Sequence, residues 1–248
     1  KRITPMRNKS PFIVLALLVS TALACSVLSP EAPTPTTAKV PTSKPAATTA
    51  PAATTAPVSK SLLQDDFASS KSGWSVNSND NGSAEYLDGE FVFKVKRTKW
   101  LKWSTTPDDK NYSNVHIEVS VRDTSADKTA LPSFGFVCGY QDNNNFYYVG
   151  AANDGAYAIA RKINGETKIL SDAKNEWAIS KDIPKNMSSY RLGADCTPSG
   201  VTLYVDGKKI ASASDSSFTS GLTGVFVLTF DIASAEVRFD DFAITQLK

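Results

Sequence analysis

Apolar and polar residues alternate with a period of two through most of the chain after residue 61. The longest such run covers residues 115–122, and shorter runs cover 91–95, 157–163 and 201–205. In the longest run, four apolar residues alternate with four polar ones: Val115, His116, Ile117, Glu118, Val119, Ser120, Val121 and Arg122. Because successive side chains of a strand point to opposite faces of its sheet, this pattern predicts half-buried β-strands.

Turn dipeptides separate these runs. Five pairs combine Asn or Asp with Gly: Asn81-Gly82, Asp88-Gly89, Asp154-Gly155, Asn164-Gly165 and Asp206-Gly207. Such pairs supply the positive φ angles that tight hairpins need. No stretch has the periodicity of an amphipathic helix beyond short turns. Many short strands with hairpin turns and no crossover helices predict an all-β, antiparallel sandwich or barrel.

Three motifs carry a resemblance to a known fold. Leu63–Phe67 (LQDDF) is followed by Ser72-Gly73-Trp74, and Val201–Gly207 (VTLYVDG) and Val237–Phe242 (VRFDDF) come later. Together they resemble concanavalin A-like jelly rolls, especially family 16 glycoside hydrolase-like and 3-keto-disaccharide hydrolase domains. The resemblance covers residues 61–248. It implies a two-sheet antiparallel jelly roll in which the first and last strands pair and a concave face often binds carbohydrate.

The first 25 residues have the order of a signal peptide: basic Arg7 and Lys9, the apolar run Phe12–Val19, then small residues. The end, Thr21–Cys25 (TALAC), resembles a bacterial lipobox with its Ala and Leu in reversed order, which predicts lipidation of Cys25. The uncharged run is also near membrane-spanning length, so an uncleaved anchor is the alternative. Either way, we expect the rest of the chain to lie outside the cytoplasm.

Residues 26–60 are rich in Pro, Thr and Ala and include a six-residue repeat that begins at Pro45. Such a segment has too few large apolar side chains to form a core, so we predict a disordered linker. The predicted organisation is therefore a leader over 1–25, a linker over 26–60 and a jelly-roll domain over 61–248.

The net charge of that domain argues against nucleic-acid binding. The whole chain carries a net charge of +2, but residues 61–248 hold 20 Lys and Arg against 24 Asp and Glu. A net acidic domain is unlike nucleic-acid binding proteins, which present a basic surface. The sequence also contains no Gly-rich phosphate loop between a strand and a helix, so a nucleotide is not expected.

The cysteines fit an exported protein. The sequence has three, and if Cys25 carries lipid, then Cys138 and Cys196 remain. Both lie in apolar alternating segments, and disulfides persist outside the cytoplasm. We predict that these two residues form a disulfide; two buried free thiols are the alternative.

No catalytic residue can be transferred from the resembled families. Retaining glycosidases need two neighbouring carboxylates, and the strand that corresponds by order, Asn145–Gly150, has none. His116 is the only histidine. It is expected to face solvent on its strand rather than to join a Ser-His-Asp triad, and no zinc site is expected, because such sites draw on several His or Cys ligands. The sequence favours a non-catalytic carbohydrate-binding or adhesion module. The alternatives are a degenerate or unfamiliar glycoside-acting hydrolase, or a structural envelope protein without a small ligand.

Aromatic residues are the candidates for contact with a polysaccharide or cell-surface glycan. Residues 94–103 combine five cations with Trp100 and Trp103, and Tyr147 and Trp177 follow later. Aromatic rings stack on sugar faces through apolar C–H groups, and cations attract anionic polymers. The alternatives are an edge strand protected by lysines and rings that belong to the core.

Calcium is the metal that the resemblance implies, at the place where the first and last strands meet. Asp66 and Asp240 lie in those strands, and calcium prefers carboxylate and carbonyl oxygens. The alternative is that both aspartates cap turns. A calcium ion there would be structural.

The lipid anchor can be tested directly. Replacing Cys25 with Ala should remove the lipid mass and release the protein or stall its processing, because the acyl chains provide the membrane affinity. Mass spectrometry and membrane fractionation would measure both effects, with Ser26→Ala as the control. A Cys25→Ala protein that remains processed and membrane-bound would show that Cys25 is not the anchor.

Overall fold

The computed structural model describes residues 60–248. The predicted leader, its lipidated Cys25 and all but the last residue of the predicted linker lie outside the described residues. Within residues 60–248, no helix is long and apolar enough to span a membrane.

The described part consists of strands and one short 3₁₀ turn, η1 (Ser70–Ser72). The strands are β1 (Ser61–Asp65), β2 (Asn77–Asn79), β3 (Gly82–Leu87), β4 (Glu90–Val95), β5 (Leu101–Thr105), β6 (Val115–Asp123), β7 (Ser133–Asp142), β8 (Asn145–Ala152), β9 (Ala156–Ile163), β10 (Glu166–Ile169), β11 (Ala178–Ile179), β12 (Tyr190–Thr197), β13 (Gly200–Val205), β14 (Lys208–Ser214), β15 (Leu222–Leu228) and β16 (Ala235–Gln246).

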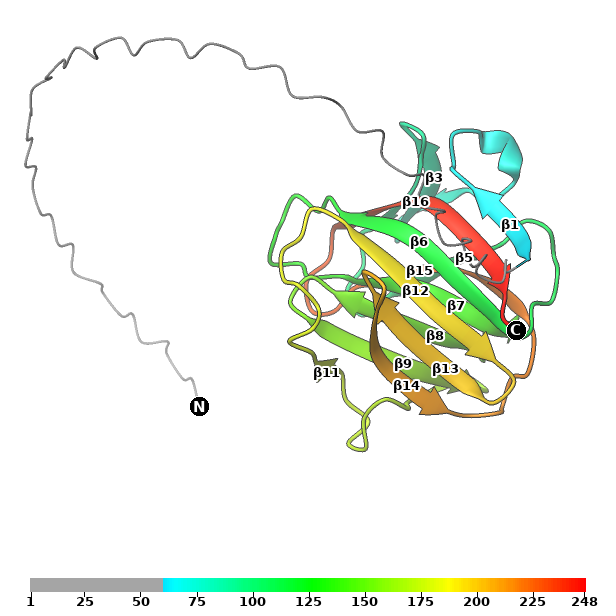
Figure 1. Ribbon diagram of the computed structural model, residues 1–248. Coiled ribbons are helices and arrows are strands. Elements are labelled where there is room, and N and C mark those ends of the chain that lie inside the picture. Colours follow the sequence, from blue (N-terminus) through cyan, green and yellow to red (C-terminus); the bar gives the residue numbers. More distant parts are fainter. Residues whose placement is uncertain (1–59) are drawn as a thin grey trace, which may run out of the picture. The chain divides into compact units, whose positions relative to one another are not determined.

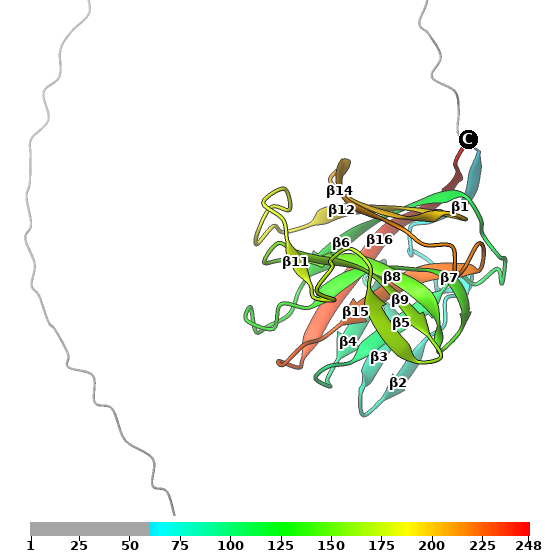
Figure 2. The ribbon, with the colours of Figure 1, turned by 90° about the horizontal axis from the view of Figure 1, so that it is seen from below.

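These strands form two antiparallel sheets. The nine-stranded sheet has the order β14-β13-β12-β6-β16-β4-β3-β2, with β1 beside β16. The seven-stranded sheet has the order β10-β9-β8-β7-β15-β5, with β11 beside β9. Figure 1 shows β6, β12 and β13 in front of β7, β8 and β9, and Figure 2 shows the two layers from below. This arrangement confirms the predicted two-sheet jelly roll.

The first and last strands pair, as the resemblance implied. Leu63 lies opposite Ile244, and Asp65 opposite Phe242. The first half of β16 pairs instead with β4, so β16 changes its neighbour part of the way along. The change coincides with a bulge at Asp240-Asp241 against β6, where Asp241 has a φ of 50°. An extra residue bends a strand, and this bend makes room for β1.

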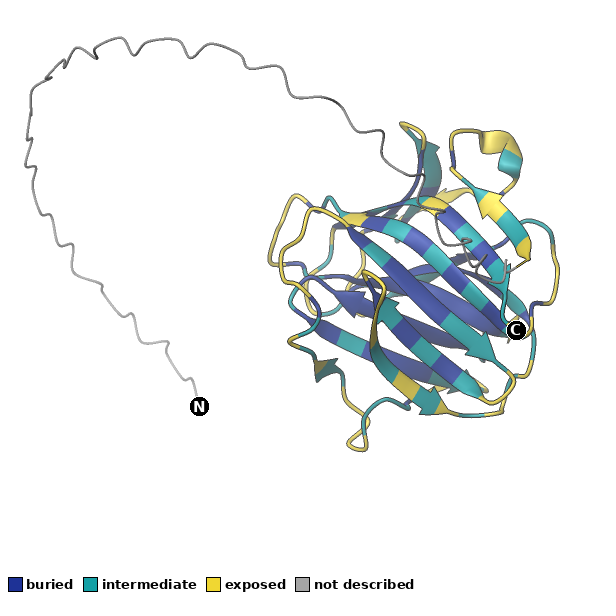
Figure 3. Cartoon of the chain, viewed as in Figure 1, coloured by how far each residue is buried: buried dark blue, intermediate teal, exposed yellow. Residues whose placement is uncertain are grey.

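The main core lies between the sheets. Alternate residues of these strands point inward, which appears in Figure 3 as alternating buried and half-buried positions along β6 and β13. Aromatic rings dominate one end: Phe91 packs on Phe67 with 5.5 Å between ring centroids, and Phe93 on Phe239 with 5.7 Å. Burying such large rings supplies much of the hydrophobic stabilisation.

One covalent bond joins the two layers. Cys138 of β7 and Cys196 of β12 form a disulfide, with their Cα atoms 6.5 Å apart. The predicted disulfide is therefore confirmed. Each cysteine belongs to a different sheet, so the bond holds the layers together directly across the core.

Removing this disulfide should destabilise the domain. It closes a loop of 58 residues, and the chain-entropy model gives about 4 kcal/mol for a loop of that size. We expect the Cys138→Ala/Cys196→Ala double variant to lose about that much free energy of unfolding in a denaturant titration. Reductant should lower the unfolding free energy of the wild type to that of the double variant, and it should leave the double variant's own value unchanged. Equal stability of the wild type with and without reductant would contradict this assignment.

Candidate functional site

The outer face of the seven-stranded sheet, which points away from the nine-stranded sheet, is apolar. We call the following residues the aromatic face: Leu101, Trp103, Val137, Tyr140, Phe146, Tyr148, Ala158, Ala160, Ile169, Trp177, Phe226 and Leu228. The ladder pairs Trp103 with Phe226, and Val137 with Tyr148. A face directed away from the main core would ordinarily be polar in an antiparallel sheet, so this second apolar layer marks a special surface.

The aromatic face has a buried floor and a half-exposed upper layer. Phe146 and Phe226 are fully buried, while Trp103, Tyr140 and Trp177 are half-buried. The Trp103 and Tyr140 rings both pack on Phe146, with centroid distances of 5.2 and 5.6 Å. Their two rings are 6.4 Å apart. Contact with the floor holds both upper rings in place, and part of each ring reaches solvent.

A bulge brings Tyr140 to this face. Cys138 points inward to its disulfide, and simple alternation would send Tyr140 inward as well. Gly139 breaks the alternation: its φ is 59°, and a Cβ atom there would lie 2.8 Å from the Cβ of Phe218. The β7–β15 register shifts at this point. Tyr140 was not predicted as a site residue, although a glycine between Cys138 and Tyr140 is a signal for such a bulge.

One charged strand residue lies on the aromatic face. Lys162 of β9 is opposite Phe146 in the ladder. Its ammonium lies 5.4 Å from the centroid of the Phe146 ring and 5.9 Å from that of Trp103. It also donates a hydrogen bond of 2.9 Å to the carbonyl of Asn143. By ladder register, the strands of this sheet, all within the described residues, place no Asp or Glu on the aromatic face.

A cavity of about 270 Å³ lies at one end of the sheet. Its lining includes Ala152 at the end of β8, Ala156 of β9, and Phe230. The Phe230 ring contacts Trp177 edge-on at 5.3 Å. Trp177 comes from the segment between β10 and β11 at the far edge of the sheet, yet it packs on the aromatic face. The half-exposed layer of the aromatic face therefore extends, through Trp177 and Phe230, toward this cavity.

The structure separates the four predicted sugar-binding aromatics. Trp103 and Trp177 lie on the aromatic face. Trp100 instead packs against the main core, with the Arg97 guanidinium 4.3 Å from its ring centroid. The prediction for Tyr147 was wrong: it is 1% exposed and lies on the inner face of β8, where its hydroxyl donates a hydrogen bond to Asp215.

Lysines of the cationic segment 94–103 contact partners in different parts of the domain. Lys94 pairs with Glu85 at 2.9 Å, and Lys99 with Asp231 at 3.1 Å. Lys102 donates a hydrogen bond to Asn77. These contacts distribute the lysines over different elements, so the segment does not present its five cations as one basic patch.

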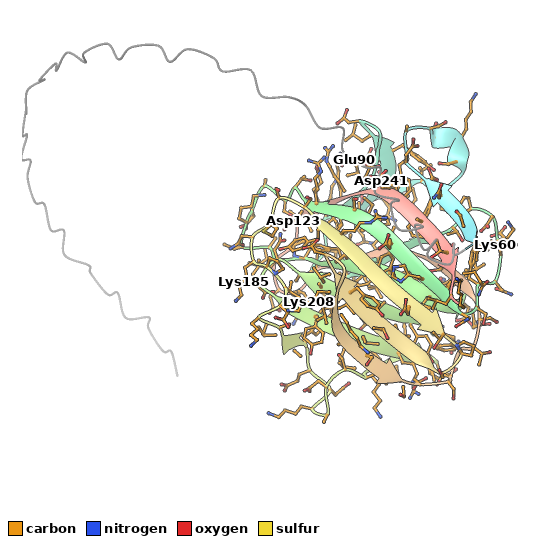
Figure 4. The ribbon with its side chains drawn as sticks, viewed as in Figure 1. Lys60, Glu90, Asp123, Lys185, Lys208 and Asp241 are labelled. Carbon is orange, nitrogen blue, oxygen red and sulfur yellow. A yellow bond between two sulfur atoms is a disulfide. The ribbon has the colours of Figure 1, made fainter. Side chains whose placement is uncertain are left out.

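A hollow of about 790 Å³ lies where β1, η1 and β16 meet. It is lined by Arg191 and four aspartates: Asp65, Asp66, Asp108 and Asp241. Asp241 stands at the bulge of β16 (Figure 4). Two of the carboxylates hold the local structure, because Asp65 accepts hydrogen bonds from Phe67 N and Trp74 Nε1, and Asp108 accepts one from Tyr112.

Asp66 and Asp240, the predicted calcium ligands, lie near this hollow. Burial raises the pKa of Asp240, and the neighbouring charges of Asp241, Glu90 and Asp66 raise it further. Asp66 accepts a hydrogen bond from Ala68 N, and Asp240 from Asp241 N. In residues 60–248, no three His, Cys, Asp or Glu side chains gather as a metal site. Two capping carboxylates fall short of the roughly six to eight oxygens that calcium takes, so calcium binding stays a prediction.

His116 lies on the outer face of the nine-stranded sheet, with its side chain 26% exposed. Its Nδ1 is 2.6 Å from Asp195 Oδ1, and its Nε2 is 3.3 Å from Glu118 Oε1. Both ring nitrogens therefore face carboxylates, and no hydroxyl takes the nucleophile position of a Ser-His-Asp triad in this described network. Tyr204 also donates a hydrogen bond to Asp195. The cluster links β6, β12 and β13.

Comparison with known proteins supports the fold. The sequence matches no protein-family profile, and no curated protein matches it. Among solved structures, the carbohydrate-binding module CBM66 from Bacillus subtilis is similar at a TM-score of 0.53 and 15% identity, over 71% of this chain and 96% of that one. An endo-β-1,3-glucanase from Pyrococcus furiosus is similar at 0.53 and 11%, over 76% and 94%. A family 16 endo-glucanase from Bacteroides ovatus is similar at 0.51 and 12%, over 73% and 99%. These likenesses show a jelly-roll fold that binding modules and glycoside hydrolases share.

The His116 cluster predicts a pH dependence of stability. The hydrogen bond to Asp195 raises the pKa of His116, and Glu118 adds to this despite partial burial. A raised pKa in the folded state stabilises the protein below the unfolded value of about 6.5 and loses this effect as pH rises through the folded value. We expect the difference in unfolding free energy between wild type and His116→Gln to shrink as pH rises above about 6.5. A difference that stays constant with pH would contradict a charged His116.

Proposed function

We propose that residues 60–248 form a non-catalytic carbohydrate-binding module that binds a polysaccharide or cell-surface glycan at the aromatic face. The observation that carries this proposal is the half-exposed pair of Trp103 and Tyr140 rings over the buried Phe146. Pyranose rings present apolar C–H patches, which pack well on such rings. Trp177 and the adjacent cavity would extend the contact along the face.

The packing of these rings suits binding. Phe146 fixes both rings from below, and the Tyr140 hydroxyl donates a hydrogen bond of 2.7 Å to Asn143 Oδ1. Side chains held in place before binding lose little conformational entropy when a ligand arrives. The Tyr140 hydroxyl, the Asn143 amide and the Lys162 ammonium stand around the rings as polar groups for sugar hydroxyls. An apolar platform with a few polar groups is typical of small-molecule sites.

The same surface argues against hydrolysis. Glycoside hydrolysis uses two carboxylates on either side of the scissile bond. No Asp or Glu of the described sheet strands lies on the aromatic face. Of the four aspartates that line the hollow at β1, η1 and β16, three accept structural hydrogen bonds: Asp65, Asp66 and Asp108. Binding without catalysis therefore fits the residues better than a glycoside-acting enzyme.

We place this module outside the cytoplasm, tethered to the membrane by a lipid on Cys25 through the Pro/Thr/Ala linker. The support comes from the sequence of residues 1–60 and from the Cys138–Cys196 disulfide, a bond typical of oxidising compartments. A tethered binding module would hold the cell surface close to its glycan.

The proposal predicts separate effects on binding and on stability. Trp103→Ala and Tyr140→Ala should each weaken polysaccharide binding about thirty-fold, because a stacking ring in a hot spot is worth about 2 kcal/mol or more. Affinity would be measured by calorimetry against a panel of soluble polysaccharides, and Tm by thermal unfolding.

Tyr147→Ala is the matched control, since Tyr147 lies on the same sheet but on its inner face. Its loss should cost about 3–5 kcal/mol of stability and leave the affinity of the folded fraction unchanged. The proposal fails if the wild type binds no polysaccharide in the panel, or if Trp103→Ala and Tyr140→Ala both bind like the wild type.

A further inference from the structure

We infer that the glycan bound at the aromatic face is anionic and that Lys162 contacts its acidic group, a carboxylate or a sulfate. This inference rests on the proposed function and names the class of ligand. Lys162 lies among the rings of the aromatic face, since its ammonium is near both the Trp103 and the Phe146 rings. A sugar stacked on Trp103 would have its substituents within reach of this ammonium.

The charge of Lys162 is not neutralised by an ion pair. Within the described residues, no carboxylate oxygen lies within 4.0 Å of its ammonium. Its hydrogen-bond partner is a neutral carbonyl, that of Asn143. An ammonium has three N–H donors, so donors remain for a ligand. The neighbouring Arg161 differs: it points to the inner face and pairs with Asp215 at 2.6 Å.

Asp142, an acidic residue that senses the charge of Lys162, is already engaged in other contacts. Asp142, the last residue of β7, accepts hydrogen bonds from Asn144 N at 2.7 Å and from the Asn145 amide at 2.9 Å. These hydrogen bonds lower its pKa, and the charge of Lys162 adds to the effect. Lys162 therefore influences Asp142 from a distance without pairing with it, and its ammonium remains directed to the aromatic cluster.

The charges around Lys162 indicate how this lysine would select an anionic glycan over a neutral one. Residues 60–248 carry 24 Asp and Glu against 21 Lys and Arg, so the described part has a small net negative charge. The aromatic face lacks carboxylates by ladder register and carries one lysine. Local complementarity of this kind fixes where a charged ligand binds and disfavours other placements. Its contribution should weaken as salt screens the charges.

Matched polymers provide the test: a polyuronate against its carboxyl-reduced form, and dextran sulfate against dextran. We expect the wild type to prefer at least one anionic polymer, with an affinity that falls as salt rises. Lys162→Gln should weaken that binding about tenfold, the size of one charge-assisted hydrogen bond, and leave the neutral counterpart unaffected. Lys162→Arg should retain the preference, which shows that charge is the cause.

Lys168→Gln is the control, because Lys168 lies in the same hairpin opposite Arg161 and so on the other face. It should bind like the wild type. Equal wild-type affinity for the anionic and neutral polymers would overturn this inference and leave the proposed function intact. An anionic preference that survives in Lys162→Gln would also overturn it. Failure of the wild type to bind any polysaccharide would instead remove the proposed function itself.

Discussion

The seven-stranded sheet carries apolar side chains on both faces, and the other features of this domain follow from that arrangement. Its inner face closes the main core against the nine-stranded sheet. Within residues 60–248 its outer face has no second sheet to cover it, so its own aromatic side chains and Trp177 cover one another. The nine-stranded sheet has an outer face of the usual kind, on which Glu90 pairs with Arg122 and Arg238. Only one outer face of the domain is therefore suited to stacking.

The disulfide and the aromatic face meet in three consecutive residues. Cys138 points inward and ties β7 to β12, Gly139 takes a left-handed conformation, and Tyr140 emerges on the outer face. A substitution at Gly139 would introduce a side chain against Phe218 and strain the backbone. The same bulge therefore serves two purposes: it leaves the cystine in the core and supplies one of the two rings on Phe146. Stability and the proposed recognition are therefore linked through this short segment.

Sequence patterns located most strands, because the alternation along β6 and β13 and the turns at Asp88 and Asp206 follow local rules; both turn residues have positive φ, as expected. The sheet face to which a side chain points was harder to predict where both faces of a strand are apolar. In β8, Phe146, Tyr147 and Tyr148 are consecutive aromatics, and alternation alone cannot say which of them points outward. Tyr147 was misplaced for this reason. Tyr140 was not predicted because a bulge reverses the alternation, whereas the predicted stacking residues Trp103 and Trp177 do lie on the aromatic face.

A jelly roll of this kind accommodates binding or hydrolysis, and the difference lies in a few side chains on one face. Hydrolysis requires carboxylates there, whose desolvation beside large rings is costly unless each is hydrogen-bonded. This domain has rings and a lysine instead, and a lysine tolerates such a place because its ammonium interacts favourably with aromatic faces. That interaction also keeps the ammonium over the platform, so little side-chain entropy is lost when a ligand's acidic group replaces water. Under the proposed function, rigid rings and a positioned cation would together favour retention of a glycan over its cleavage.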